Sequence, residues 1–452
     1  MTKDMTRGNP IKLILLFSIP LLIGNIFQQF YNMADTVIVG RTIGVTALAA
    51  VGATGSISFL VLGFVQGLTS GFSVITAQRF GAGDEAGVRR SFATSVLLSI
   101  ASTAVVTTVS VLGARPLLEL MQTPADIIDQ SYAYIVCIFF GIGATVFFNL
   151  LSGIIRALGD SKTPLIFLII ACIVNIVLDF VLIVNVHMGV AGAAVATVAA
   201  QLLSGVCCLV YMFRRFSILK LKKSDWKFDP AFAWEHLRVA LPMAFQFSIT
   251  AIGVVVVQSV LNGFGSTSVA AFTAASKIDQ VATQPLLSFG VAMATFTAQN
   301  YGAGHFHRIR EGVKKCVVVS IAASILGAAV VIIFGGALTR LFVGNAAAEV
   351  ISLSRTYLTA VSLFYWVLGL LFIFRNTMQG MGRALVPMSA GVTELVLRVV
   401  ASFTLAKALG YLGVCLASPL AWIGAAVLLC IFYVRTMRTI PNEDEPAPPT
   451  TV

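Results

Sequence analysis

Long apolar segments, separated by short polar breaks, fill almost the whole of this 452-residue chain. Only 11% of its residues are charged and 58% are hydrophobic, whereas a soluble domain carries roughly 25% charged residues. A single soluble core stops growing at about 250–300 residues, so it could not bury this much apolar surface. Many segments reach about 20 residues, the length that crosses a bilayer as a helix. The alternating ten-residue pattern of an outer-membrane barrel is missing. The sequence therefore predicts an all-α polytopic membrane protein.

Charged residues and Gly/Pro breaks divide the apolar sequence into twelve predicted transmembrane spans. The one sizeable hydrophilic interruption, 214–232, is predicted to be a cytoplasmic linker between an N-terminal lobe (1–213) and a C-terminal lobe (233–440). The Pro-rich, acidic segment 441–452 is predicted to be disordered. The twelve predicted spans are 11–39, 46–77, 91–114, 127–155, 163–186, 189–213, 235–263, 267–299, 313–337, 348–376, 385–408 and 411–434.

The two halves of the sequence repeat each other. The motif "AQRFGAG" at 77–83 recurs as "AQNYGAG" at 298–304, a shift of 221 residues, and Gly189 matches Gly410 at the same shift. Six spans in each half is an even number, so the halves are predicted to be parallel, related by an axis along the membrane normal. The predicted architecture is two pseudo-symmetric six-helix lobes around a central cavity, which is typical of transporters.

The placement of Lys and Arg predicts the orientation. With the N-terminus in the cytoplasm, 23 basic residues, Arg375 among them, fall at inner positions and five at outer positions, while Lys277 and Arg398 fall inside spans. By the positive-inside rule, both termini are predicted to be cytoplasmic. We expect the protein to lie in the inner (plasma) membrane of the cell.

Polar residues of the N-terminal half fall at a common depth. At a rise of about 1.5 Å per residue, Asp35 lies about 9 Å from the outer end of its span, and Asp179 and Thr197 about 12 Å from theirs. Asn175 is one helical turn from Asp179 on the same face. The in-span basic residues belong to the other half of the chain, so the sequence offers these acids no cationic partner.

Ionisable residues within spans usually face a cavity and mark ion or proton pathways. Two neighbouring acids in a region of low dielectric constant disfavour double ionisation, so we expect one of them to gain and lose a proton near neutral pH. The alternative is that Asp35 stays protonated and bonds to a backbone carbonyl. Pro20 interrupts the backbone hydrogen bonds of the same span, and is predicted to be a conformational hinge, or otherwise a static kink.

The C-terminal half contains a second polar cluster. Lys277 and Asp279 share one span, and Glu394 and Arg398 stand four residues apart on another, at the spacing of an intrahelical ion pair. Two acids and two bases can neutralise one another, so a packing role competes with a role in a binding site.

Other classes of function find little support in the sequence. No basic soluble domain is present to bind nucleic acid. The seven cysteines lack metal-binding spacing, so no metal site is predicted. The four histidines lie at span ends or in loops, and no HExxH or GxSxG pattern occurs, so the chain is not predicted to be an enzyme.

The chain resembles the multidrug and toxic compound extrusion (MATE) family along nearly its whole length. The resemblance rests on the six-plus-six spans, "NMADTVIVG" at the end of the first span, the paired "AQRFGAG" and "AQNYGAG" motifs, and "VNIVLD" in the fifth span. It implies cation-coupled efflux of cationic or amphiphilic drugs by alternating access. It also implies a site tied to proton coupling at Asp35, Asn175, Asp179 and Thr197, with a bend at Pro20.

The resemblance has one departure. Some family members carry sodium-binding carboxylates in the seventh and tenth spans, where this chain has none within the membrane. That difference favours the DinF-like, proton-coupled branch.

The leading hypothesis is proton-driven antiport of organic cations or amphiphilic drugs, without a cofactor, by a monomer embedded in the lipid bilayer. Sodium coupling stays open, because carboxylate and amide oxygens suit a hard cation. A flippase for a lipid-linked anionic precursor is the other alternative, and would need in-span Arg or Lys in its cavity.

Overall fold

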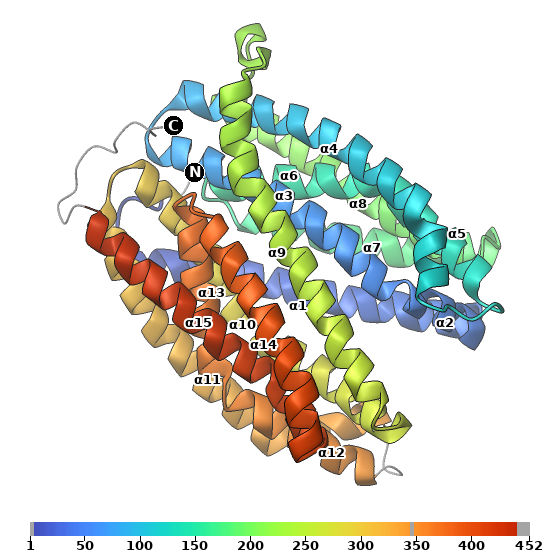
Figure 1. Ribbon diagram of the computed structural model, residues 1–452. Coiled ribbons are helices and arrows are strands. Elements are labelled where there is room, and N and C mark those ends of the chain that lie inside the picture. The colour runs from blue at the N-terminus through green and yellow to red at the C-terminus, as the bar shows by residue number, and fades with distance from the viewer. Residues whose placement is uncertain (1–3, 344–347, 441–452) are drawn as a thin grey trace. The chain divides into compact units, whose positions relative to one another are not determined.

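The computed structural model describes residues 4–343 and 348–440, and within these ranges every regular element is helical. The segment 441–452, which the sequence predicts to be disordered, lies outside the described residues. The helices follow one another along the chain as long rods joined by short turns (Figure 1). Their bounds are α1 Pro10–Thr42, α2 Val45–Ala53, α3 Gly55–Gly81, α4 Glu85–Leu120, α5 Ile128–Phe140, α6 Ile142–Ala157, α7 Lys162–Asp179, the π-helix η1 Phe180–Asn185, α8 Val190–Arg215, the 3₁₀ turns η2 Ser217–Leu219 and η3 Lys223–Trp226, α9 Pro230–Asn262, α10 Ser266–Gly302, α11 Phe306–Val343, α12 Ala348–Ser362, α13 Tyr365–Gly380, α14 Leu385–Leu409 and α15 Tyr411–Thr439.

The predicted all-helical membrane fold is confirmed. In the described ranges nine helices are long and apolar enough to cross a membrane, and eleven spans result when two bent pairs are each taken as one. The pairs are α5–α6, bent by 44°, and α12–α13, bent by 49°. The remaining predicted span, 385–408, coincides with α14, which carries three charged residues.

The bend between α5 and α6 lies at a close helix contact. It occurs at Gly141, where an added Cβ would lie 2.1 Å from a methyl group of Val198 in α8. Any side chain at this position would push α8 away, so the close approach of α8 requires glycine.

Contacts divide the described chain into two compact units. Unit 1 contains Ile23–Ser248 together with Asp4, and unit 2 contains Met5–Leu22 and the described residues from Ile249 onward. These boundaries differ from the lobes expected from the order of the spans. The linker turns η2 and η3 and the first part of α9 belong to unit 1, whereas the first part of α1 belongs to unit 2.

Each unit has its own apolar core. In unit 1, Phe72 and Phe92 pack with Ile154 and with Ala240 and Ala244 from the start of α9. The helices α3 and α9 approach so closely that a Cβ on Gly71 would lie 2.3 Å from the Cα of Ala240. Small residues at a helix contact are typical of membrane proteins, because they let backbones approach.

The core of unit 2 includes residues from the start of the chain. Met5, Ile14 and Phe17 pack with Met293 and Phe296 of α10, and all five side chains are buried. Because the first part of α1 contributes to this core, its place in unit 2 rests on apolar burial as well as on hydrogen bonds.

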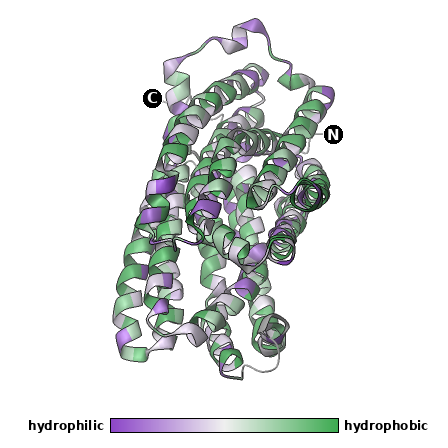
Figure 2. Ribbon diagram, turned by 90° about the vertical axis from the view of Figure 1, so that its right-hand side faces the viewer, coloured by the Kyte–Doolittle hydropathy of each residue, from purple (hydrophilic) through white to green (hydrophobic). Residues whose placement is uncertain are grey.

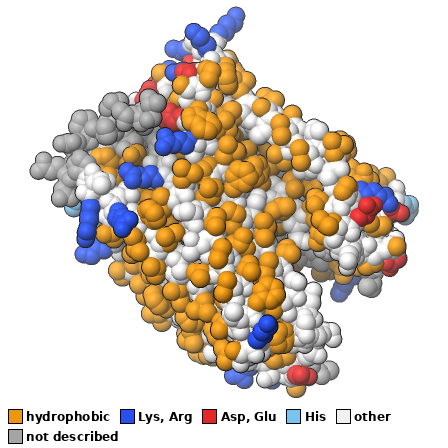
Figure 3. All heavy atoms as spheres, in the orientation of Figure 1, with side chains coloured by type: hydrophobic (Ala, Val, Ile, Leu, Met, Phe, Trp, Pro, Cys, Tyr) orange, Lys and Arg blue, Asp and Glu red, His pale blue; other side chains and the backbone are white. Residues whose placement is uncertain are grey.

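Apolar side chains also cover outward faces of the helices. Leu112 of α4 is 75% exposed and Ile333 of α11 is 69% exposed. Hydrophobic residues follow the helices along most of their length (Figure 2), and orange side chains cover much of the face drawn in Figure 3. Apolar surface on this scale fits contact with lipid chains and not with water.

The internal repeat is visible in backbone geometry. Gly189 and Gly410 precede α8 and α15 with nearly the same left-handed conformation, φ 60° and 61°. This conformation is readily adopted by glycine alone, which explains why the two positions match in the sequence.

Candidate acid-pair site

Asp35 and Asp179 meet inside unit 1. Asp35 lies on α1, and Asp179 is the last residue of α7 and is fully buried. The two carboxyl groups are close enough to influence each other electrostatically. Two neighbouring carboxylates in a region of low dielectric constant repel each other, so the pair favours a state in which one of them is protonated. The arrangement is an acid pair that can store and release a single proton.

The acid pair has little other polar support. Asp35 Oδ1 and both oxygens of Asp179 are buried and receive no hydrogen bond from the described residues. No Lys or Arg in residues 4–343 and 348–440 forms an ion pair with either acid. A buried carboxylate without a partner is costly when charged, so the site favours a protonated or cation-bound state.

Asn175 and Thr197 lie beside the acid pair, as the sequence predicts. Asn175 is fully buried and donates from Nδ2 to Thr197 Oγ1 at 3.5 Å, while its own Oδ1 receives no hydrogen bond within the described chain. Thr197 Oγ1 also accepts a hydrogen bond from Tyr31 at 3.1 Å. The structure therefore brings together all four residues predicted for this site.

Two tyrosines that the sequence did not predict also belong to this site. Tyr31 precedes Asp35 by one helical turn, and Tyr134 comes from α5; both interact electrostatically with the two acids. The i, i+4 spacing of Tyr31 and Asp35 could have indicated the first. Tyr134 carries no such signal, because its proximity depends on how α5 packs.

The backbone changes character at Asp179. The α-helix ends at this residue and continues as a π-helix over Phe180–Asn185. π-Helical segments are rare and occur frequently at functional sites, where they alter the direction of side chains. Buried Ile183 and Val190, with Ile38 and Val39 of α1, form an apolar cluster next to Tyr134.

The predicted cluster of Lys277, Asp279, Glu394 and Arg398 does not form as one unit. Glu394 Oε1 accepts from Arg398 at 2.6 Å, the expected intrahelical pair. Asp279 instead accepts a hydrogen bond from Tyr365 at 2.7 Å. Lys277 is exposed, and no ion pair joins it to an acid among the described residues.

Arg375 replaces Lys277 in this cluster. Its Nη2 lies 2.7 Å from Glu394 Oε2, and both side chains are more than 90% buried. The sequence counts Arg375 among the basic residues at inner positions, and the structure adds that this side chain is buried. The residue lies inside α13, where Glu394 on α14 compensates its charge.

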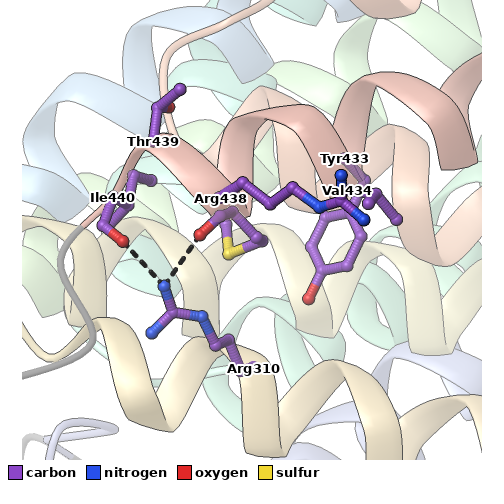
Figure 4. A pocket seen from close by; sticks show the side chains of 7 residues that line it. Arg310, Tyr433, Val434, Arg438, Thr439 and Ile440 are labelled. Carbon is purple, nitrogen blue, oxygen red and sulfur yellow. Dashed lines mark hydrogen bonds between the residues drawn. The ribbon is translucent and has the colours of Figure 1, made fainter.

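Pro20 lies within a continuous α1 and is buried. It belongs to unit 2, three residues before α1 enters unit 1 at Ile23. A cavity of about 780 Å³ lies in unit 2, and none of the predicted site residues lines it. Arg310 at its edge donates to the backbone carbonyls of Met437 and Ile440, both at 2.9 Å (Figure 4).

Comparisons with known proteins agree with this architecture. The MatE family model matches residues 20–181 and 241–404. The chain is 28% identical over 386 residues to "Probable multidrug resistance protein YpnP" of Bacillus subtilis, covering 84% of this chain and 85% of that one. It is 27% identical over 382 residues to "Probable multidrug resistance protein YoeA" of the same organism, covering 82% and 81%.

The fold also matches solved structures. A transporter of the MOP superfamily from Pyrococcus furiosus superposes with a TM-score of 0.90 at 24% identity, covering 97% of this chain and 99% of that one. Because the family model matches well over half of the chain and the all-helical fold agrees, this protein belongs to the MATE family of multidrug efflux transporters and is a transporter rather than an enzyme.

Proposed function

We propose that this protein exports cationic or amphiphilic organic compounds in exchange for protons, with Asp35 and Asp179 as the groups that carry the proton. The observation that supports this most strongly is a pair of carboxyl groups, Asp179 buried and Asp35 partly buried, without a cationic partner in the described chain. Such a pair can be neutralised by a proton or by a positively charged ligand, and competition between the two couples their movements in opposite directions.

The neighbouring residues fit roles around that exchange. Thr197 receives the hydroxyl of Tyr31 and the amide of Asn175, so it fixes both side chains next to the acids. Asn175 keeps a carbonyl oxygen that receives no hydrogen bond in the described structure, and therefore stays available to a cation or to a protonated acid. Changes in protonation at Asp179 act on the junction between α7 and the π-helix η1.

The substrate class follows from charge and from the relatives' names. An anionic site selects positive charge, and two bacterial relatives are named as probable multidrug resistance proteins. We place the protein in the inner (plasma) membrane as a monomer with both termini cytoplasmic. Basic residues at inner positions outnumber those at outer positions by 23 to five.

Transport in inside-out vesicles tests the proposal. Uptake of ethidium is driven separately by a proton gradient and by a sodium gradient, in the wild type and in Asp35→Asn and Asp179→Asn. We expect the proton gradient to drive uptake by the wild type and neither variant to respond to it. Asp126→Asn, the same change at an exposed loop acid, is the matched control and should transport normally.

Other outcomes would redirect the proposal. Uptake that follows the sodium gradient alone would assign the oxygens of Asp35 and Asp179 to sodium binding instead of proton exchange. Normal proton-driven uptake by Asp35→Asn would remove that residue from coupling. A flippase for anionic precursors finds less support, because Arg375 and Arg398 already share Glu394.

A further inference from the structure

The repeated motif has the same local structure in both halves of the chain. At 77–83 it ends α3, and at 298–304 it ends α10. Both copies form four backbone hydrogen bonds at matching positions, and each contains a left-handed glycine, Gly83 at φ 71° and Gly304 at φ 74°. The turn alone accounts for the glycines. It does not account for the polar residues at the second and third positions of the motif, which point to a further role.

In unit 1, the third residue of the motif contacts the start of α9. Arg79 donates from Nη2 to both carboxylate oxygens of Glu235 at 3.0 Å, and its guanidinium group lies 5.4 Å from the centre of the Phe232 ring. Arg90 of α4 lies against the same ring at 4.9 Å and forms an ion pair with Asp229. The segment immediately before and within the first turn of α9 is thus held by two arginines of unit 1.

A buried polar chain continues this contact. Thr76 and Ser91 are 2.9 Å apart, Ser91 Oγ lies 2.9 Å from His236 Nε2, and His236 Nδ1 lies 2.9 Å from the carbonyl oxygen of Phe232. The side chains of Thr76, Ser91 and His236 are fully buried. Separating α9 from α4 would leave these groups without partners, at a cost that a satisfied network avoids.

In unit 2, the other copy of the motif contacts the segment before α1. Gln299 Oε1 accepts from the backbone nitrogen of Met5 at 2.8 Å, and Asn300 Nδ2 donates to the carbonyl oxygen of Met5 at 3.2 Å. Arg308 donates to Asn300 at 2.9 Å and to the same carbonyl oxygen at 3.2 Å. Met5 is 1% exposed. Arg79 and Asn300 occupy the same position of the repeat. Arg79 binds the start of the first helix of the C-terminal half, and Asn300 binds the segment just before the first helix of the N-terminal half.

We propose that the two motif copies are clasps, each of which holds the start of the other half's first helix throughout the transport cycle. The start of α9 stays with unit 1 and the start of α1 stays with unit 2, while the remainder of each helix belongs to the other unit. Movement of the units is then taken up within α1 and α9, each of which contains a proline, Pro20 and Pro242, shortly before it changes unit. Arg79, His236, Gln299 and Asn300 act as positioning residues.

The clasps are built to persist over the pH range of a proton-driven exchanger. The backbone N–H groups of Phe232 and Ala231, together with Arg90, hold the pKa of Asp229 below its ordinary value. A lowered pKa keeps the carboxylate charged at and above the ordinary Asp value, and the contact is lost only at lower pH. The clasp residues do not belong to the acid pair. The proposal therefore depends on the protein being a transporter, but not on which ion is coupled to transport.

Reversible cross-linking tests whether the contacts persist. In a chain whose seven native cysteines are replaced, Arg90→Cys with Asp229→Cys joins the unit 1 clasp, and Met5→Cys with Arg308→Cys joins the unit 2 clasp, through a bifunctional methanethiosulfonate. We expect drug transport in proteoliposomes to continue without loss of rate after either cross-link. The four single-cysteine variants, treated with the same reagent, control for modification alone.

A loss of transport on cross-linking would have the opposite meaning. Transport that stops on cross-linking and returns on reduction would show that the contacts must open, and would overturn the proposal. Amide hydrogen exchange of the wild type provides a second measurement that needs no variant. We expect the segment 230–240 to stay protected at acidic and at alkaline pH, with and without drug, whereas loss of its protection under any one of these conditions would contradict a permanent clasp.

Discussion

Glu394 is predicted to hold unit 2 together by compensating two buried arginines. Its two oxygens lie 2.7 Å from Arg375 and 2.6 Å from Arg398, and all three side chains are at most 9% exposed. The Nε–H groups of both arginines already find no hydrogen-bond acceptor in the described chain. No other acceptor is therefore available to replace Glu394. Removing one member of a buried ion pair typically costs about 3–5 kcal/mol, because the remaining charge is left uncompensated. We expect Glu394→Ala to lose stability in this range.

The assay follows unfolding in mixtures of dodecyl maltoside and SDS through the reactivity of Cys415, which is buried in the core of unit 2. Thr404→Ala, at an exposed site on the same helix, is the control, and should change the free energy of unfolding by less than about 0.5 kcal/mol. A triple variant, Arg375→Met with Glu394→Leu and Arg398→Met, should recover the loss, because apolar replacement of a buried ionic cluster is often neutral or stabilising. A loss below about 1 kcal/mol in Glu394→Ala would refute the reasoning, since that is the size expected for one ordinary hydrogen bond.

Two further predictions concern unit 1. Gly71→Val should prevent the close packing of α3 on α9, because even a Cβ would lie 2.3 Å from the Cα of Ala240. We expect the variant to lose its monodisperse peak in size-exclusion chromatography, and a normal peak would contradict the importance of this contact. Tyr31→Phe removes the hydrogen bond to Thr197, which is worth about 0.5–1.5 kcal/mol. We expect this variant to bind drug severalfold more weakly while the amount of folded protein stays unchanged. Equal affinity of the variant and the wild type in titration calorimetry would show that Tyr31 is not part of the site.

The sequence predicted the helical segments and the acid pair well, for physical reasons. Apolar runs report directly on spans, because the bilayer imposes their length. A carboxylate inside such a run is costly, so Asp35 and Asp179 stood out from composition and depth alone. Their common depth was sufficient to predict that they meet, and the resemblance to a known family supported the same residues.

Contacts between distant parts of the chain were less predictable. Arg375 lies close to the end of an apolar run, where a loop charge and a buried charge look alike, and Glu394 on the next helix decides between them. The start of α1 belongs to unit 2 and the start of α9 belongs to unit 1. Hydropathy could not predict this, because apolar residues would be needed for packing against either unit. The sequence shows that the motif at 77–83 is repeated, but the partners of its polar residues depend on tertiary contacts that the sequence does not reveal.

Proton release on drug binding shows whether the acid pair exchanges a proton for the cation. The purified transporter, in a weakly buffered detergent solution with a pH indicator, is mixed with tetraphenylphosphonium. We expect the wild type to release protons as the cation binds, and Asp35→Asn and Asp179→Asn to release none, because the acid pair that holds the proton is broken. Equal proton release by the wild type and both variants would contradict the account.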